Sequence, residues 1–511
     1  MLGKLLEKRD SPKALYFLLG ISLAMKIVLL FLNRPFNSDG ILYITAAQYF
    51  AEGNFAEGLA VYPMPLYSLL ITGVHFVIPD WELTAKLIST TSMVLVIIPL
   101  YLLTTHLFNR RVAFWACLAL ALAPVPNDWS VDVIRGPIFV FFAVLTVYVA
   151  QMAIDLKSQK HFVITALLVG ISFLFRIEGV IILFFFGGYG IYLILNAKKD
   201  RNLVLKGFTT WLAVLVVLVV FACGATYIYE GDFNRVEELA KRAEHIVSLD
   251  FLKNYHIIYN QLYTLEEHSP NSDTNRSFAE VARHFMFLVY VIGEAQVFFK
   301  VLFPLFIIPF FLGLKKSFDK RQAFLLGLIC FYLFVMYVFY IDRNYMHKRF
   351  LFAPVVLAFP WVGAGLEIMF SKLKKSFHPK MYFAVFFALF LISPSVESVH
   401  SLAEEDNVLR KAGTWLKQHK LLHESKVLTN ESRAPFFAGI RYSESVFMDS
   451  EIHDVKEIEK NALRHNADII LLQVSNDDEY VQGMTSYEKL KIFRGKKRDV
   501  YIFCRSNTIK N

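Results

Sequence analysis

The stretch ALYFLLGISLAMKIVLLFLNRPFNSDGILYITAAQYF, residues 14–50, joins the first long apolar run of the chain to the first carboxylate that follows it. Residues 14–33 have the length that a membrane span needs, roughly 20 residues. Basic residues precede this run and no small-residue cleavage site follows it, so we interpret it as a retained span and not as a signal peptide. Asp39 then begins a short helical pattern, and the question is what a lone carboxylate does just beyond a span.

Composition places the chain among membrane proteins. Its 511 residues are 56% hydrophobic and 15% aromatic, with 49 phenylalanines, and the mean hydropathy is +0.45. An ordinary soluble globular protein is less apolar. The net charge of +9 comes from short basic clusters between apolar runs, which is typical of membrane topology and not of nucleic-acid binding. The 4 cysteines show no CxxC or Cys/His spacing, so we predict neither a disulfide framework nor a metal site.

Eleven apolar runs are long enough, or nearly so, to cross a membrane. The run Leu66–Ile78 is too short, and we expect a helix at the interface there. The predicted spans are 14–33, 84–107, 112–126, 137–154, 161–177, 179–196, 204–228, 296–314, 322–340, 349–370 and 381–396.

The distribution of basic residues predicts the orientation. Every second connection is basic, at 4–13, 110–111, 157–160, 198–201, 315–321 and 372–375, which predicts a cytoplasmic N-terminus. From about residue 400, helical patterns such as NVLRKAGTWLKQH alternate with strand patterns such as DIILLQV and DVYIFCR. We therefore predict a polytopic α-helical membrane domain over 1–399 and an extracytoplasmic α/β domain over 400–511. The outside segments of the membrane domain are 34–83, 127–136, 229–295 and 341–348.

Asp39 has two interpretations. A carboxylate at the start of a helix is favoured by the free N–H groups and by the helix dipole, so Asp39 is an N-cap in the simpler one. In the other, Asp39 is the general base of a transfer reaction at the outer face.

Other charged residues at the same predicted face as Asp39 also have two possible roles, one structural and one in substrate binding. Asp132 and Arg135 lie three apart and form either a local ion pair or, through Arg135, a phosphate contact. Arg176 and Glu178 interrupt an apolar hairpin, where charges face a cavity or each other. We favour a role beyond mutual pairing, because both lie at the same predicted face as Asp39.

A basic cluster follows the ninth span. Its members Arg343, His347, Lys348 and Arg349 lie outside in the predicted topology, against the usual bias for basic residues inside. An anionic partner at the outer surface explains them, and an error in the topology is the alternative.

Four motifs, in this order along the chain, carry a family resemblance: SDG at 38–40, VYPMPLY at 61–67, RIEG at 176–179 and HKRFLFAPVVLAFPWVGAG at 347–365. Together they resemble GT-C fold glycosyltransferases, in the group that includes protein O-mannosyltransferases and the aminoarabinose transferases of lipid A. The resemblance covers roughly residues 1–400. It departs from the common pattern at Asp39-Gly40, where many relatives carry Asp-Glu.

The resemblance implies transfer of a sugar from a polyprenyl-phosphate carrier to a protein, lipid or glycan acceptor outside the cytoplasm, with inversion. The sequence shows no metal-ligand spacing, so we predict neither a metal nor another cofactor. The resemblance also implies a bacterial inner (plasma) membrane. It matches Asp39 to the catalytic base, and cations near the leaving phosphate suit the chemistry. The implied substrate-binding residues are Tyr43, Tyr62, Arg135, Arg176, Glu178, His347, Lys348 and Arg349.

Two other functions compete with the transferase. One is a membrane transporter or lipid flippase with a soluble cap; the other is an assembly partner whose working part is the C-terminal domain. Two repeated halves, which many transporters show, are not visible in the sequence. The charges also gather at one predicted face and not at the bilayer midplane, which favours an enzyme.

Overall fold

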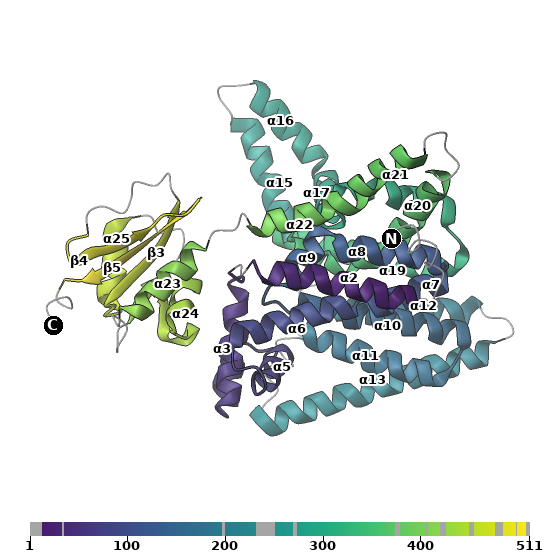
Figure 1. Ribbon diagram of the computed structural model, residues 1–511, viewed down its shortest axis with the longest axis horizontal. Coiled ribbons are helices and arrows are strands. Elements are labelled where there is room, and N and C mark those ends of the chain that lie inside the picture. Colours follow the sequence, from purple (N-terminus) through teal and green to yellow (C-terminus); the bar gives the residue numbers. More distant parts are fainter. Residues whose placement is uncertain are drawn as a thin grey trace. The chain divides into compact units, whose positions relative to one another are not determined.

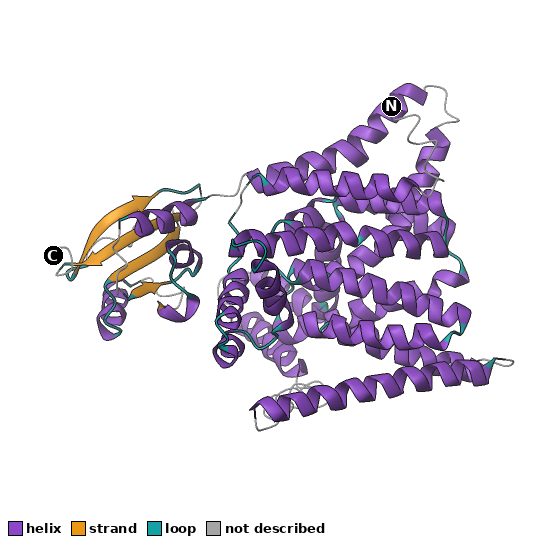
Figure 2. Ribbon diagram, turned by 60° about the horizontal axis from the view of Figure 1, so that its bottom comes forward, coloured by secondary structure: helices purple, strands orange, loops and turns teal. Residues whose placement is uncertain are grey.

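The computed structural model describes residues 13–32, 35–196, 200–230, 251–268, 273–373, 379–403, 407–419, 426–448, 454–475, 484–496 and 498–506. Most of these residues are helical, and one sheet lies near the C-terminus (Figures 1 and 2). The chain divides into two compact units. The first unit comprises Met1–Met25, Ser92–Asn127 and Gly136–Ser398, and the second comprises Lys26–Thr91, Asp128–Arg135 and Val399–Asn511.

The described α-helices up to residue 403 follow one another in chain order. They are α2 (Lys13–Leu30), α3 (Asp39–Ala51), α4 (Phe55–Val61), α5 (Leu66–His75), α6 (Trp81–Leu95), α7 (Ile97–Leu107), α8 (Arg110–Leu122), α9 (Pro124–Ser130), α10 (Gly136–Leu156), α11 (Gln159–Phe175), α12 (Gly179–Asn196), α13 (Arg201–Glu230), α15 (Phe251–His268), α16 (Asp273–His284), α17 (Met286–Leu302), α18 (Ile307–Ser317), α19 (Ala323–Arg343), α20 (Phe352–Leu373), α21 (Pro379–Phe387) and α22 (Ser393–Ala403). Part of the predicted segment 229–295, residues 231–250 and 269–272, lies outside the described residues.

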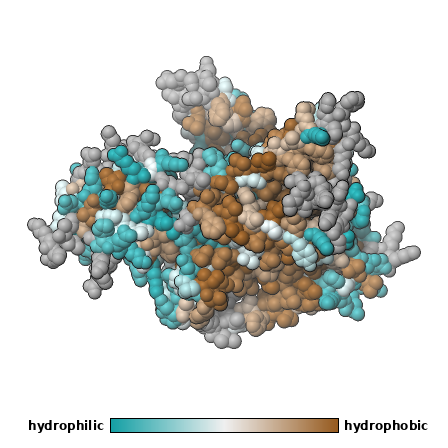
Figure 3. All heavy atoms as spheres, viewed as in Figure 1, coloured by the Kyte–Doolittle hydropathy of each residue, from teal (hydrophilic) through white to brown (hydrophobic). Residues whose placement is uncertain are grey.

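The prediction of a polytopic helical membrane protein is confirmed. Among the described residues, 8 helices are long and apolar enough to span a membrane, and the bent pairs α8–α9 and α16–α17 raise the number to 10. Helix α11 is apolar but shorter. Consecutive large side chains of α13 are exposed, among them Val217 (66%) and Phe221 (75%), as expected of a lipid-facing helix. Figure 3 shows hydrophobic residues covering much of the helical part.

Two predicted spans are not single straight helices. The interval 112–126 is divided between α8, which ends at Leu122, and α9, which begins at Pro124 at an angle of 60°. The interval 296–314 is not one helix, because α17 ends at Leu302 and α18 begins at Ile307. Phe303 between them has a φ of 81°, and Pro304 follows it. Proline has no N–H to donate and disfavours helical geometry at the preceding residue, which explains the break. The helix expected at Leu66–Ile78 is present as α5, ten residues long.

Helix α20 is the most buried of the candidate spans, with 83% of its apolar window buried. Glycines allow this close packing: a Cβ atom at Gly363 would overlap the carbonyl oxygen of Val112 in α8, and one at Gly365 would overlap that of Pro309 in α18. Small residues at helix crossings are the usual way in which membrane helices pack tightly. Trp115 of α8 also donates to Glu367 of α20 over 2.8 Å.

The predicted C-terminal α/β fold is confirmed. Strands β1 (Val427–Thr429), β2 (Ser445–Phe447), β3 (Ile469–Ser475), β4 (Tyr487–Phe493) and β5 (Arg498–Arg505) form a sheet in the order β2-β1-β3-β5-β4. Strand β1 is parallel to both β2 and β3, whereas β5 is antiparallel to β3 and β4. Helices α23 (Val408–Gln418) and α24 (Arg433–Ala438) pack in the apolar cluster of one face, and α25 (Val455–Arg464) packs in that of the other. Alternation along β3 decides this division, since Ile469 and Leu471 belong to the first cluster and Ile470 and Leu472 to the second.

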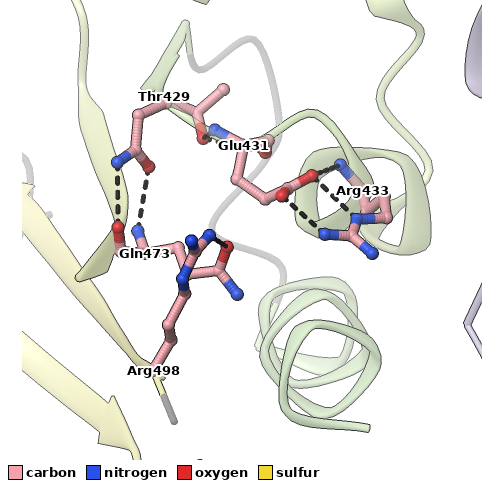
Figure 4. Close-up of polar contacts among 6 residues, drawn as sticks. Thr429, Glu431, Arg433, Gln473 and Arg498 are labelled. Atoms are coloured by element: carbon pink, nitrogen blue, oxygen red, sulfur yellow. Dashed lines mark hydrogen bonds and ion pairs between the residues drawn. The ribbon is translucent and has the colours of Figure 1, made fainter. Parts of the chain in front are cut away.

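Polar side chains cross-link the carboxyl ends of β1 and β3 (Figure 4). The amide of Asn430 donates to the carbonyl oxygen of Gln473 and accepts from its N–H, both over 2.9 Å. Beside it, Glu431 accepts from the guanidinium of Arg433 over 2.8 Å. These contacts fix the turn that leads from β1 into α24.

Candidate active site

The first turn of α3 is anchored by Asn37. The side-chain oxygen of Asn37 accepts from the N–H of Gly40 over 3.2 Å, and its amide donates to the carbonyl oxygen of Val133 over 3.2 Å. The N–H of Asn37 donates to a carboxylate oxygen of Asp132 over 3.0 Å. Ser38 occupies the N-cap position and Asp39 is the first helical residue. The interpretation of Asp39 as the N-cap is therefore wrong, because Asn37 supplies the side-chain contact to the first turn.

Arg135 lies against an aromatic cluster that begins one helical turn beyond Asp39. Its guanidinium is 5.1 Å from the ring centre of Tyr62 and 5.9 Å from that of Tyr43. The two rings meet edge to face, with centres 4.8 Å apart. Because Asp39 and Tyr43 are four residues apart in α3, they share a helix face. Asp39, Tyr43, Tyr62 and Arg135 thus form one local group in the second unit.

Neighbouring helices hold this group in place. The ring of Tyr43 packs edge to face against that of Tyr67 in α5, with centres 5.3 Å apart. The hydroxyl of Ser89 in α6 donates to the carbonyl oxygen of Ile134 over 3.0 Å, and Thr72 of α5 donates to the carbonyl oxygen of Ala47 in α3 over 2.9 Å. Helices α3, α5 and α6 and the segment 128–135 are therefore tied together by hydrogen bonds and ring contacts.

Gly40 explains why this chain has no second carboxylate after Asp39. A Cβ atom at position 40 would lie 2.7 Å from the ring of Phe36 and 2.8 Å from Cβ of Val133. Real Cβ atoms do not approach other heavy atoms so closely. The departure from the Asp-Glu pattern is thus a packing requirement of the contact between α3 and Val133.

We expect Gly40→Ala to lower the free energy of unfolding by about 1–3 kcal/mol, the usual cost of overpacking. Gly73→Ala is the matched control, since Gly73 is also helical and a Cβ there meets nothing within 4 Å. That control is expected to be neutral or stabilising, because alanine favours helices over glycine. Thermal unfolding of the purified protein in detergent checks both, and equal effects of the two substitutions would contradict the packing argument.

Arg176 and Glu178 form an ion pair between α11 and α12 in the first unit. The Nε of Arg176 donates to both carboxylate oxygens of Glu178 over 3.1 Å, and one Nη bonds to the same group. Both residues are 7% exposed. Mutual pairing, which we did not favour from the sequence, is therefore what the structure shows, and carrier binding by these two residues stays a prediction.

His347, Lys348 and Arg349 lie together at the start of η4 (Lys348–Phe350), a 3₁₀ turn before α20. The imidazole of His347 accepts from the N–H of Arg349 over 3.2 Å. Lys348 is half-buried, and burial together with the nearby charge of Lys300 in α17 lowers its pKa. Within the described ranges, no carboxylate forms an ion pair with either lysine. A half-buried cation next to a second cation favours an anionic ligand.

Two residues that support the group of Asp39, Tyr43, Tyr62 and Arg135 were not predicted from the sequence. Asn37 was detectable only as a possible cap, since Asn is favoured before a helix. Met64, whose sulfur accepts from Arg135 over 2.8 Å, lies in the VYPMPLY motif but was not among the implied site residues. Among the residues that the structure describes, no three His, Cys, Asp or Glu side chains could hold a metal ion. The expectation of a metal-free, cofactor-free site stays a prediction.

Comparisons with known proteins agree with this architecture. Residues 62–227 match the family model of dolichyl-phosphate-mannose-protein mannosyltransferase. The apo oligosaccharyltransferase of Archaeoglobus fulgidus is similar, with a TM-score of 0.56 and 13% identity over 90% of this chain and 70% of that chain. Its complex tethered with an acceptor peptide containing the NVT sequon has a TM-score of 0.55 and 13% identity over 90% and 69%.

A second similar structure is ArnT from Cupriavidus metallidurans bound to undecaprenyl phosphate. Its TM-score is 0.54, with 12% identity over 95% of this chain and 97% of that chain. No curated protein sequence matches the chain. The family match and the shared fold confirm the resemblance to GT-C fold glycosyltransferases and the predicted fold class.

Proposed function

We propose that this chain is an integral membrane glycosyltransferase that moves a sugar from a polyprenyl-phosphate carrier to an extracytoplasmic acceptor, with inversion, in a bacterial inner membrane. The N-terminus is cytoplasmic and the C-terminal domain extracytoplasmic in this proposal. The observation that carries it is the arrangement of α3 in a GT-C fold. Asp39 and Tyr43 share a face of α3, and Arg135 lies over the ring of Tyr43.

In the proposed reaction the acceptor hydroxyl attacks the anomeric carbon and the carrier phosphate leaves. Asp39 takes the hydroxyl proton, which a carboxylate within hydrogen-bond reach can do. Cations stabilise the charge that develops on the leaving phosphate. We assign to that phosphate the cations that the family resemblance implies, Arg135, Lys348 and Arg349, because a guanidinium matches phosphate geometry and a half-buried ammonium gains from an anion.

The comparisons support the substrate classes. ArnT from Cupriavidus metallidurans binds undecaprenyl phosphate, and the Archaeoglobus fulgidus enzyme is known with an acceptor peptide. A lipid-linked donor suits a chain whose described helices expose many large apolar side chains.

The assignment of Lys348 predicts a pH dependence of carrier binding. The pKa of Lys348 is lowered by burial and by Lys300, so its ammonium is lost at a lower pH than that of an ordinary lysine. The affinity for undecaprenyl phosphate is therefore expected to fall by about tenfold between roughly pH 7 and 10, the value of one hydrogen bond to a charged group. Lys348→Arg should flatten this dependence, because a guanidinium stays protonated. Titration calorimetry checks it, and an unchanged slope in Lys348→Arg would remove Lys348 from the carrier site.

A transfer assay tests the function itself. Purified protein in nanodiscs is given a panel of radiolabelled polyprenyl-phosphate sugars, with and without membrane extract as a source of acceptor. Consumption of one donor, absent without the protein, would support the proposal and identify the sugar. If no donor binds or reacts, the transporter or flippase alternative gains support, and transbilayer movement of the lipid is the measurement to make.

A further inference from the structure

The C-terminal domain contacts the far end of α3. Glu52, the C-cap of α3, bonds to the guanidinium of Arg441 through both carboxylate oxygens, one contact being 3.1 Å. The same guanidinium lies 5.1 Å from the ring centre of Tyr49, whose hydroxyl is 2.7 Å from that of Ser443. A carboxylate at a helix C-terminus opposes the helix dipole, and Arg441 supplies the compensating cation. The hydrogen bond from Arg441 lowers the pKa of Glu52, so the pair is charged at neutral pH and is lost only in acid.

The domain also contacts the segment just before Asp39. Phe36 is fully buried, and its ring meets Phe436 and Phe437 of α24 edge to face, with centres 5.3 Å and 5.6 Å apart. The guanidinium of Arg410 in α23 covers the ring of Phe437 at 4.3 Å. Such aromatic contacts favour one arrangement over others, beyond the apolar area that they bury.

Arg410 connects this contact to α6. It donates to both carboxylate oxygens of Glu82, over 3.0 Å and 2.6 Å. Glu82 lies in the first turn of α6, the helix whose Ser89 holds the segment that carries Arg135. The domain therefore contacts both ends of residues 36–52 and the start of α6, all within the second unit.

We propose that residues 399–511 position α3 for the transfer step. Helix α3 has 13 residues, and an isolated helix of this length is marginal in water, so contacts at its two ends add to the stability that α5 and the segment 128–135 provide. Phe436 and Phe437 at one end and Arg441 at the other fix the segment that carries Asp39. These three are positioning residues that act through Asp39 and do not contact the substrate. The catalytic part of this inference rests on the proposed function, whereas the contacts are testable without a sugar donor.

The first experiment reverses the charge pair. In Arg441→Glu, hydrogen exchange of the amides of residues 39–51 is expected to rise about fivefold, the upper range for an exposed ion pair. The kcat for transfer should fall by about tenfold, because small displacements of a catalytic group are costly. The affinity for undecaprenyl phosphate should stay within twofold. Combining Arg441→Glu with Glu52→Arg restores the pair and is expected to restore both exchange and kcat.

Glu457→Arg is the matched control. Glu457 is an exposed carboxylate in the first turn of α25 of the same domain. Reversing its charge should change neither the hydrogen exchange of residues 39–51 nor the kcat. Unchanged exchange in Arg441→Glu, or a double variant that stays as impaired as the single one, would overturn the proposal. If no donor reacts at all, the proposed function fails, and the exchange data still decide whether the domain holds α3.

The second experiment removes the aromatic contact. Phe436→Ala with Phe437→Ala changes two half-buried rings, so the sheet domain is expected to keep its fold. The amide hydrogen exchange of residues near Asp39 should rise and the kcat for transfer should fall, whereas the affinity for undecaprenyl phosphate should be unchanged. Phe493→Ala, which removes a ring packed against Trp415 elsewhere in the domain, is the control. Equal exchange rates for this control and the double variant would overturn the role of α24.

Discussion

Asp39→Asn is expected to lower the rate of sugar transfer by about 10²–10⁴-fold, the usual contribution of a general base. Asparagine keeps the size of the side chain but cannot take a proton from the acceptor hydroxyl. Asp39 lies in the first turn of α3, where a negative charge is worth at most about 1 kcal/mol to the helix. Loss of activity with a small change in stability would therefore mark a chemical role.

Asp80→Asn controls for the loss of a carboxylate at a helix start. Asp80 accepts from the N–H of Leu83 over 2.9 Å at the beginning of α6, in the same unit as Asp39. Its substitution should cost as much stability as Asp39→Asn and leave transfer near the wild-type rate. Single-turnover rates with the donor found in the panel separate chemistry from product release. If Asp39→Asn keeps more than about one tenth of the wild-type rate, far above the loss expected for a base, Asp39 is not the base.

The helical membrane fold could be predicted from the sequence because long apolar runs are a strong signal. The prediction over 296–314 was wrong for a local reason, since average hydropathy does not register the turn at Phe303–Pro304. The apolar run DIILLQV predicted a strand of the C-terminal domain, and residues from both faces of β3 lie in apolar clusters.

The candidate site could be predicted less well, because its contacts join residues far apart in the sequence. The start of α3 was visible, but Asn37 meets Asp132 across 95 positions. The pair of Glu52 and Arg441 spans 389 positions. No periodicity or motif encodes such contacts. Arg176 and Glu178 are the opposite case, since two residues of opposite charge so close in sequence made pairing one of the two alternatives from the start.

Arg176→Ala has the second large expected effect, on stability. Its partner Glu178 would remain as a buried carboxylate without its cation, and breaking a buried pair in this way costs about 3–5 kcal/mol. Replacing both residues, as Arg176→Met with Glu178→Leu, should cost far less, because buried ion pairs are often replaced by apolar residues at little cost. Thermal unfolding of the three proteins in detergent measures this, and a double variant as unstable as the single one would contradict it.

The double variant also decides whether Arg176 serves the carrier. Because it is expected to remain folded, its affinity for undecaprenyl phosphate can be compared with that of the wild type without a difference in stability. A guanidinium that contacts the phosphate contributes about tenfold or more to affinity. A loss of that size in a folded double variant would show that the ion pair orients Arg176 toward the carrier. Equal affinities would mean that Arg176 and Glu178 serve each other and join α11 to α12, and that the carrier phosphate is bound by other cations.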